Sequence, residues 1–159
     1  MPSVLAASGQ STADQAKSRF GEKILEIQIC PTDAILKVVP GAWKDVHAFL
    51  KSEGFDFFVS VSAVDWIKEN LMWVVTHLYD SGLNRRISVK AEVPRADARI
   101  ESLAGLWKGA NWHERECYDL SGVTFTGHPD LRRILCPDDW EGHALRKDYK
   151  APDYYHGIQ

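Results

Sequence analysis

The sequence is poor in three features that would each assign the protein to a functional class. No apolar run approaches the roughly 18–20 residues that span a lipid bilayer. The net charge of −3 and the pI of about 6.1 lack the basic excess that is typical of nucleic-acid binding. The three cysteines, Cys30, Cys117 and Cys136, are odd in number and follow no disulfide framework, which favours a reducing compartment. We therefore expect no nucleic-acid partner and no membrane span.

The sequence also lacks the short motifs of common enzyme active sites. Segment 105–109 (GLWKG) does not have P-loop spacing, and segment 112–117 (WHEREC) lacks the second histidine of an HExxH metal site. Ser102 and Ser121 lie in no GxSxG turn and have no base at a recognisable spacing. The N-terminus shows no charged region followed by an apolar one, so no secretory signal is expected. These absences weigh against an autonomous active site.

The composition is that of a globular protein with one domain. The chain has 159 residues, of which 45% are hydrophobic and 26% charged, enough for a sizeable core. Residues 1–12 predict a flexible tail, and His47 lies on or near the apolar face of a predicted amphipathic helix. We expect it to be a core or boundary histidine, because no other ligand-type residue shares its spacing. The first half of the chain predicts, in order, a short helix over 13–20, strands over 25–30 and 34–39, and the amphipathic helix that contains His47 over 41–53.

Three consecutive segments in the middle of the chain have strand character. Segments 55–66, 71–79 and 85–93 are rich in β-branched and aromatic residues or alternate in polarity. The connections between them are short and rich in turn residues, which predicts an antiparallel meander. We expect one face of this sheet to be covered by helices, and the face of Arg86 and Lys90 to meet solvent or a partner.

The last third of the chain predicts two helices and then an irregular segment. Asp97 is placed to cap a helix that reaches Trp107, and a second helix is predicted over 112–118. After Gly122 no periodicity remains, and loops of this length are uncommon in compact domains unless they bind something. The predicted fold class is α+β, with an antiparallel or mixed sheet, helices on one face and an extended, loop-rich C-terminal arm. The predicted organisation is a tail (1–12), an α/β domain (13–121) and a docking arm (122–159).

Metal binding is the main chemical alternative for the stretch 111–149. Five potential ligands occur there: His113, Cys117, His128, Cys136 and His143. His113 and Cys117 share one face of the predicted helix, but no second close pair completes a zinc pattern. We therefore expect the cysteines to be small buried apolar residues. A small metal enzyme that uses His113, Cys117 and His143 remains an alternative from a different functional class.

The charges of this stretch indicate contacts rather than catalysis. Glu114 and Glu116 point about 200° apart on a helix, so they do not converge on one substrate. The pairs Arg132-Arg133 and Arg146-Lys147 lie in irregular backbone beside aromatic residues and acids. Arginine paired with carboxylates, together with rigid aromatic side chains, is typical of protein interfaces. These residues favour a contact arm on a small α+β domain.

The same residues resemble a known family. The run Glu114 to Leu120 (ERECYDL), then GHPDLRRIL (127–135), PDDW (137–140) and LRKDY (145–149), resembles the C-type subunit of NADH–quinone oxidoreductase, the 30-kDa subunit family of respiratory complex I. The tight match covers about forty residues, and the preceding region fits the family in element order and length. The departures from the family pattern are Cys117, Ser121, Cys136, Ala144 and Lys150. They affect local packing and leave the charged framework intact.

The resemblance implies a non-catalytic structural subunit of the peripheral arm of a proton-translocating enzyme. It implies no cofactor in this chain, with FMN and the iron–sulfur clusters held by partner subunits. It implies docking on the quinone-site subunits D and B, and contact with a neighbouring ferredoxin-like subunit. It places the chain on the cytoplasmic side of the membrane, attached only through the assembled complex. Equivalent subunits of ferredoxin-driven complexes or membrane-bound hydrogenases are the alternative.

On this basis a set of charged and aromatic side chains is expected to form ion pairs and contacts within the chain and between subunits. No catalytic, cofactor-binding or metal-binding residue is predicted. The predicted subunit-interface residues are Glu114, Arg115, Glu116, Asp119, His128, Arg132, Arg133, Asp138, Trp140, Arg146, Lys147, Asp148 and Tyr149.

Overall fold

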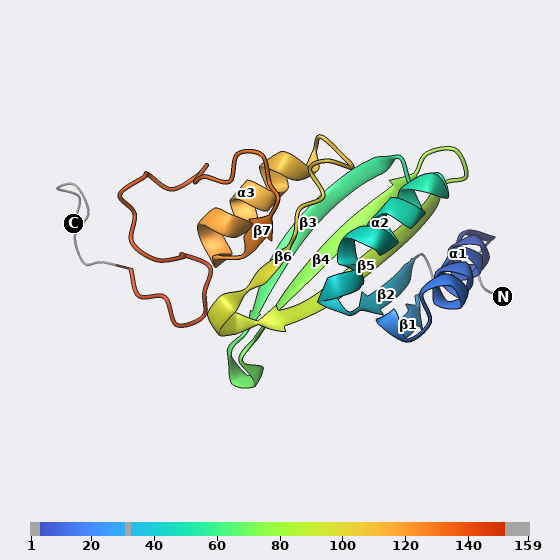
Figure 1. The fold of residues 1–159 in the computed structure, drawn as a ribbon, viewed down its shortest axis with the longest axis horizontal. Coiled ribbons are helices and arrows are strands. Elements are labelled where there is room, and N and C mark those ends of the chain that lie inside the picture. Colours follow the sequence, from blue (N-terminus) through green and yellow to red (C-terminus); the bar gives the residue numbers. More distant parts are fainter. Residues whose placement is uncertain (1–3, 31–32, 152–159) are drawn as a thin grey trace.

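A five-stranded mixed sheet with helices over one face forms the body of the protein (Figure 1). The computed structural model describes residues 4–30 and 33–151, and side chains from residue 11 onward. The helices are α1 (Val4–Phe20), α2 (Trp43–Ser52) and α3 (Ala110–Ser121), with short 3-10 turns η1 (Gly21–Lys23), η2 (Pro40–Ala42), η3 (Ile67–Glu69) and η4 (Arg95–Asp97). The strands are β1 (Ile24–Ile29), β2 (Ala34–Val38), β3 (Phe57–Trp66), β4 (Leu71–Asp80), β5 (Arg85–Pro94), β6 (Arg99–Glu101) and β7 (Thr124–Thr126).

The strand order is β1-β2-β5-β4-β3, with β3 at one edge and β1 at the other. The predicted meander is confirmed, because β3 pairs antiparallel with β4, and β4 with β5. Strand β2 pairs with β5 in parallel, which makes the sheet mixed. A parallel partner needs a long crossover, and the chain from α2 to β4 provides it. The predicted α+β fold class is confirmed.

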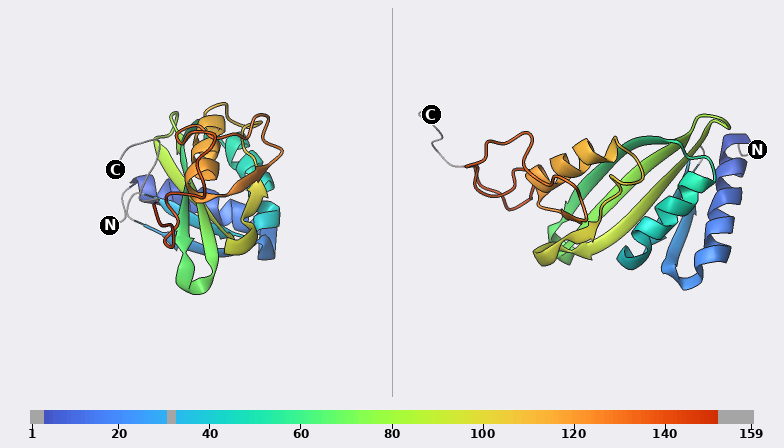
Figure 2. Two further views of the ribbon diagram at one scale, coloured as in Figure 1. Left: turned by 90° about the vertical axis from the view of Figure 1, so that its left-hand side faces the viewer. Right: turned by 45° about the horizontal axis from the view of Figure 1, so that its top comes forward.

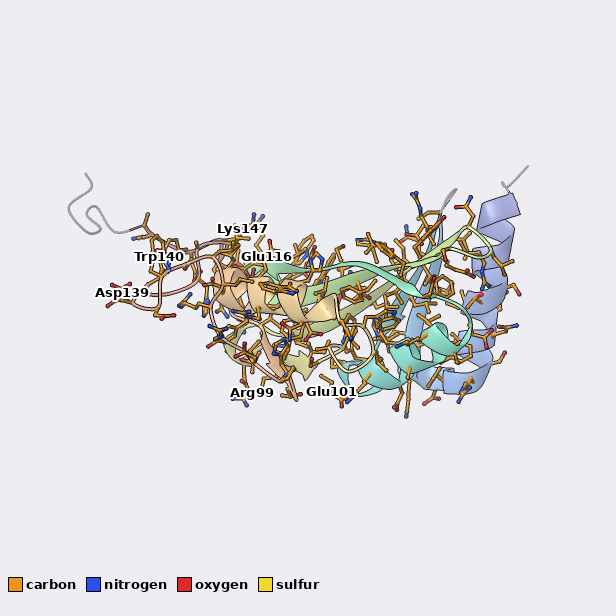
Figure 3. All side chains as sticks on the ribbon, turned by 90° about the horizontal axis from the view of Figure 1, so that it is seen from above. Arg99, Glu101, Glu116, Asp139, Trp140 and Lys147 are labelled. Atoms are coloured by element: carbon orange, nitrogen blue, oxygen red, sulfur yellow. The ribbon has the colours of Figure 1, made fainter. Side chains whose placement is uncertain are left out.

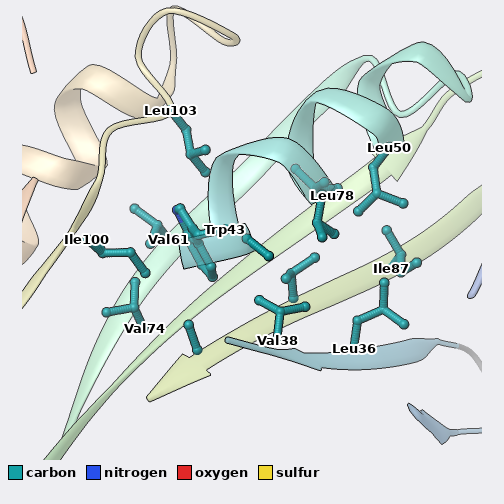
Figure 4. Close-up of a cluster of buried hydrophobic side chains, with 14 of the residues drawn as sticks. Leu36, Val38, Trp43, Leu50, Val61, Val74, Leu78, Ile87, Ile100 and Leu103 are labelled. Carbon is teal, nitrogen blue, oxygen red and sulfur yellow. The ribbon is translucent and has the colours of Figure 1, made fainter. Parts of the chain in front are cut away.

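The core lies between the inner face of the sheet and α2 (Figure 4). Trp43, Val46, His47 and Leu50 recur at the spacing of one helix face, and all are fully buried. They pack on inward side chains of β2, β4 and β5, of which Leu36, Val74 and Ile87 have no exposed surface. Each large apolar side chain buried in this way stabilises the fold by about 1.5–3 kcal/mol.

His47 is a core histidine, as expected from its position on the apolar helix face. Its Nδ1 donates to the Trp43 carbonyl oxygen at 2.7 Å, and its Nε2 lies 2.7 Å from the Thr76 hydroxyl. Burial lowers the pKa of His47 to about 4, although the bond to Trp43 acts in the opposite direction. The imidazole is therefore neutral at physiological pH and belongs to the core.

The outer face of the sheet is more apolar than the polar face expected from the β5 pattern. Trp66 and Trp73 contact each other with ring centroids 4.3 Å apart, and Lys90 lies over the Trp73 ring. Ser88 is buried, donating to Asp33 Oδ2 at 2.6 Å. The β4 strand is thus apolar on both faces, a pattern more usual for covered strands than for strands that face water.

Two helix predictions were wrong in position. The helix predicted to begin at Ala13 begins at Val4, so it takes up most of the segment assigned to a tail. Residues 97–107 form no α-helix: Asp97 ends η4, and the short strand β6 and turns follow it. Strand β6 pairs in parallel with β7, which lies in the segment predicted to be irregular. Tertiary pairing decided this region, since apolar residues such as Ile100 and Leu103 could equally have lined a helix face.

From residue 127 to residue 151 the chain has no helix or strand and extends beyond α3, at the end of the molecule opposite α1 (Figure 2). We refer to residues 123–151 as the arm. In the part of the chain that the structure describes, no helix is long and apolar enough to cross a membrane. The division into tail, domain and arm stays a prediction.

Candidate functional site

The arm is attached to the domain through α3, which buries polar side chains. Glu114, Arg115 and Asp119 are buried, alongside Cys117. The helix ends at Gly122, which has φ +74°, the left-handed conformation that favours glycine at this position. Buried charges are costly unless they are paired or hydrogen-bonded. The arm provides most of the partners.

Asp119 is the centre of the attachment, which we call the Asp119 hub. Its Oδ2 accepts backbone N–H bonds from Ile134, Leu135 and Cys136 at 3.0, 2.7 and 2.8 Å. Its Oδ1 lies 2.6 Å from Arg133 Nη1, and the carboxylate has no exposed surface. Burial alone would raise the pKa of Asp119, but these donors outweigh it and hold the pKa well below the ordinary range. One ionised side chain thus shapes the backbone of the arm.

The arm also satisfies the carbonyl groups that α3 leaves unpaired at its C-terminus. The backbone N–H of Leu145 donates to the Leu120 carbonyl at 2.8 Å. Arg146 Nε donates to the Ser121 carbonyl at 2.9 Å. A helix leaves four carbonyl groups without internal partners, and its C-terminus favours positive charge. The returning arm is therefore a cap for the helix.

Arg133 and His143 join the two ends of an arm loop. Arg133 donates to the carboxylate and carbonyl of Asp119 and, at 2.9 Å, to the carbonyl of Gly142. His143 Nδ1 donates to the same Asp119 carbonyl at 3.0 Å. Residues 134–143 therefore leave and return at one point, and they form a projecting loop with a closed base. Figure 3 shows Asp139 at the outer tip of this loop.

Arg115 holds the arm through backbone groups, and its expected ion pair stays a prediction. Its Nε and Nη2 donate to the carbonyl groups of Arg132 and Arg133 at 3.2 and 3.1 Å. Its guanidinium also lies over the Trp112 ring, 5.4 Å from the centroid. Among the described residues no carboxylate lies within ion-pair distance of Arg115. The planar fork of donors suits this bridging role, which lysine could not reproduce.

A second attachment, the Asp65 clasp, fixes the far end of the arm. Arg95 binds both oxygens of Asp65, at 2.7 and 2.9 Å, and reaches Asp148 at 2.5 Å. The backbone N–H of Lys147 donates to Asp65 at 2.8 Å. The Arg95 guanidinium lowers the pKa of Asp65, against the effect of burial. Asp65 and Arg95 were not among the predicted residues, although a carboxylate at an inward strand position is a sign of a buried pair.

Glu114 and His128 connect α3 to the first turn of the arm. Glu114 accepts bonds from the Ser102 hydroxyl and the Leu103 N–H, both at 2.6 Å. His128 Nε2 lies 3.9 Å from the Glu114 carboxylate and 3.2 Å from the Asn111 carbonyl. His128 Nδ1 accepts the Asp130 N–H at 3.0 Å, so Nε2 is the ring nitrogen that donates. Burial raises the pKa of Glu114 to about 7, while the bonds from Ser102 and Leu103 act to lower it.

Replacing Glu114 with glutamine should therefore remove a pH dependence of stability. The folded pKa lies above the unfolded value, so the protonated carboxyl stabilises the fold below about pH 4.5, and this contribution is lost as pH rises to about 7. The loss for the wild type should be on the order of 3 kcal/mol. Denaturant unfolding at pH 5 and pH 8 measures it. Glu101→Gln, at an exposed neighbour, should keep the wild-type pH profile; a variant E114Q that also keeps it would contradict the assignment.

The structure does not bring the potential metal ligands together. Within the described residues, no group of three or more His, Cys, Asp or Glu side chains could hold a metal ion. Cys117 lies against the Val61 carbonyl, and burial raises the pKa of its thiol to about 12. His143 and His128 bind backbone carbonyls. The expectation of a buried apolar cysteine is confirmed for Cys117 and was wrong for Cys136, which the open arm leaves half-buried.

Most of the other predicted interface residues are exposed on the arm and on α3, while Trp140 and Tyr149 are half-buried. Trp140 and Tyr149 stack with ring centroids 6.2 Å apart, and the exposed Arg132 pairs with neighbouring Asp130. Large apolar side chains are exposed beside them, with Leu135 62% and Leu145 59% accessible. Glu116, Asp138 and Lys147 are also exposed. The predicted set thus divides into an internal scaffold and an outward surface, and its role between subunits stays a prediction.

Comparison of the sequence with known proteins identifies relatives that match most of the chain. Residues 36–155 match the family described as "Respiratory-chain NADH dehydrogenase, 30 Kd subunit". The chain is 40% identical over 151 residues to the C-type NADH-quinone oxidoreductase subunit of Chlorobium phaeobacteroides, covering 92% of this chain and 91% of that protein. It is 42% identical over 142 residues to the corresponding C-type protein of Geobacter sulfurreducens, covering 86% and 88%. A chloroplastic J-type subunit of NAD(P)H-quinone oxidoreductase from Cryptomeria japonica is 36% identical over 151 residues, covering 92% and 95%.

Solved structures share the fold. A trypsin-resistant fragment of Nqo5 matches with a TM-score of 0.66 and 27% identity, covering 77% of this chain and 98% of that one. A chain of the membrane-bound sulfane sulfur reductase, an archaeal respiratory membrane complex, matches with a TM-score of 0.79 and 24% identity, covering 90% and 86%. The family expected from the ERECYDL and LRKDY segments is confirmed by the sequence matches. This chain belongs to the family of the 30 kDa subunit of respiratory-chain NADH dehydrogenase.

Proposed function

We propose that this chain is a non-catalytic structural subunit of the peripheral arm of a proton-translocating NADH–quinone oxidoreductase, and that its own C-terminal arm docks on the quinone-site subunits D and B. The observation that carries the proposal is the arm itself. It is irregular in backbone, yet it is held at the Asp119 hub and the Asp65 clasp. Its outward surface exposes Leu135 and Leu145 to solvent, and a docked partner would cover them.

A segment held in this way is well suited to binding. Ordering a loop on association costs conformational entropy, and a loop that is ordered beforehand avoids much of that cost. The projecting loop 134–143 exposes Leu135 beside the acids Asp138 and Glu141. Leu145 is exposed just after it. Apolar side chains with a charged surround match the usual composition of an interface.

The internal bonding supports a structural role. The buried polar groups of α3 are bonded to the arm or to the 102–103 turn. A catalytic group would need to face a cavity with room for substrate. On this proposal FMN and the iron–sulfur clusters belong to partner subunits, among them a ferredoxin-like neighbour. The chain then lies on the cytoplasmic side and meets the membrane only through the complex.

The alternative is an equivalent subunit of a ferredoxin-driven complex or a membrane-bound hydrogenase. This alternative is kept because the fold is shared with a chain of the archaeal sulfane sulfur reductase complex. Fold alone does not identify the electron donor, because one fold can serve many different functions.

Purification of the tagged, full-length chain from membranes tests the proposal. We expect subunits D and B and the NADH-oxidising subunits in the same fraction, together with NADH-dependent quinone reduction. Recovery of the same fraction with hydrogenase-type subunits and no NADH oxidation would favour the alternative. Recovery of the chain by itself would contradict the docking role.

A further inference from the structure

A groove runs between α3 and the outer edge of β3, outside the bonds that hold the arm. Its volume is about 410 Å³, which lies in the lower part of the roughly 300–1,000 Å³ range of ligand pockets. Ser60 and Ser62 line it from β3, His113 and Glu116 from α3, and Leu145 from the arm. It therefore lies where the domain, the helix and the arm meet.

Several polar groups of this groove are left without a partner by the described residues. Within the described residues, the Glu116 carboxylate and the hydroxyls of Ser60 and Ser62 make no side-chain hydrogen bond or ion pair. This differs from Glu114 and Asp119 on the same helix, whose carboxylates are fully bonded. Glu116 is the one charged residue among those that line the groove. The groove thus has a net negative charge that this part of the chain leaves unmatched.

Part of the wall of the groove is apolar. Leu120 and the exposed Leu145 flank it. A lysine or arginine side chain has a matching division, with an aliphatic stem that packs on apolar surface and a cationic head that carries only donors. Three acceptors around one site suit such a head.

The floor of the groove argues against an added β-strand. Cys117 Sγ lies 3.5 Å from the Val61 carbonyl oxygen, so the thiol already occupies the outer edge of β3. Burial first, and then the nearby charge of Glu116, raise the pKa of this thiol, which therefore stays a neutral donor. With this carbonyl taken, the groove admits a side chain more readily than a strand, which would need free backbone groups.

We infer that this groove is a docking pocket for a lysine or arginine side chain of a partner subunit, with Glu116 as its ion-pair partner. The inference rests on the proposed function and adds the chemistry of one contact. Figure 3 shows Glu116 on the surface at the arm end of the domain, on the side that also carries Lys147. A partner that lies along the arm would therefore pass over the groove.

The test is retention of subunits by the full-length chain that carries Glu116→Lys, purified as a complex at low and at high ionic strength. Charge reversal should lower the amount of retained partner subunits roughly tenfold at low ionic strength. Raised salt should reduce this difference between E116K and the wild type. E116D should retain most of the binding. Glu69→Lys, which makes the same charge change at an exposed residue of η3, should behave as wild type.

The outcomes separate the two proposals. Wild-type retention by E116K, with loss of partners when the Asp119 hub is broken, would overturn the pocket and leave the docking role intact. Loss of partners in both E116K and E69K would also overturn it, because the effect would then be one of net charge. If the wild-type chain brings down no partner, the docking role fails first. A thermal melt of E116K should match wild type, since Glu116 is exposed and holds no element in place.

Discussion

Replacing Asp119 with asparagine should release the arm from α3 and lower the free energy of unfolding by on the order of 3 kcal/mol. The carboxylate binds three successive backbone N–H groups and Arg133, and it has no exposed surface. An asparagine retains one acceptor oxygen, while its amide nitrogen would face donors. The loss leaves partly buried N–H groups without an acceptor and a guanidinium without a counter-charge.

The substitution should loosen the arm more than it loosens the rest of the domain. Hydrogen exchange of residues 134–143 should accelerate more than that of the sheet, and subunits that dock on the arm should be lost. Asp138→Asn is the matched control, because Asp138 is exposed in the same loop. Equal protection of the loop in D119N and D138N would disprove the hub. Because the folded pKa of Asp119 is depressed, its contribution is present above about pH 4 and is lost as pH falls through the folded pKa.

Replacing Gly122 with alanine should displace the arm by a different route. Gly122 has φ +74°, and a Cβ there would lie 2.5 Å from His143 Cδ2 and 2.8 Å from Arg146 Nη2. Real contacts are never so short, so the side chains that cap α3 must move. Alanine also pays about 1 kcal/mol for the left-handed backbone. We expect a loss of stability clearly larger than that backbone cost, with increased proteolysis of the arm.

Gly127→Ala separates the two causes. Gly127 has φ +79°, but a Cβ there meets nothing within 4 Å. This variant has the same backbone cost without the collision. Denaturant unfolding and limited proteolysis of both variants should show that only G122A frees the arm. If G127A is as damaging as G122A, close contact between arm and helix is not what matters at Gly122.

Some elements could be predicted from the sequence because their local backbone preferences agree with their tertiary packing. The β3–β5 meander combines strand-forming residues with short turns, so its pairing was predictable and is confirmed. Helix α2 has one apolar face, and His47 on that face is in the core as expected. In residues 97–107, the local preference and the tertiary packing conflict. Ile100 fits an apolar helix face, but pairing of β6 with β7 took precedence.

The charged residues show the same division within the candidate site. Arg133 and Asp119 were predicted to form pairs, and they pair with each other. Their positions in the ERECYDL and DLRRIL segments indicated the charges that would pair. Asp65 and Arg95 were missed, because they lie thirty residues apart in segments whose local pattern is that of a strand and its end. Only the tertiary structure brings them together as the Asp65 clasp.

By itself, the sequence determined the fold class, the family and the set of side chains that bear charge in the arm. These depend on residue type and on spacing along the chain, which are local properties. Only the tertiary structure decided which charges face inward and which face outward. Asp119 and Glu116 are three residues apart on one helix, yet one is a saturated hub and the other an unpaired acceptor in a groove. The cause is the path of the arm, which returns over the end of α3 and supplies donors to one side of that helix only.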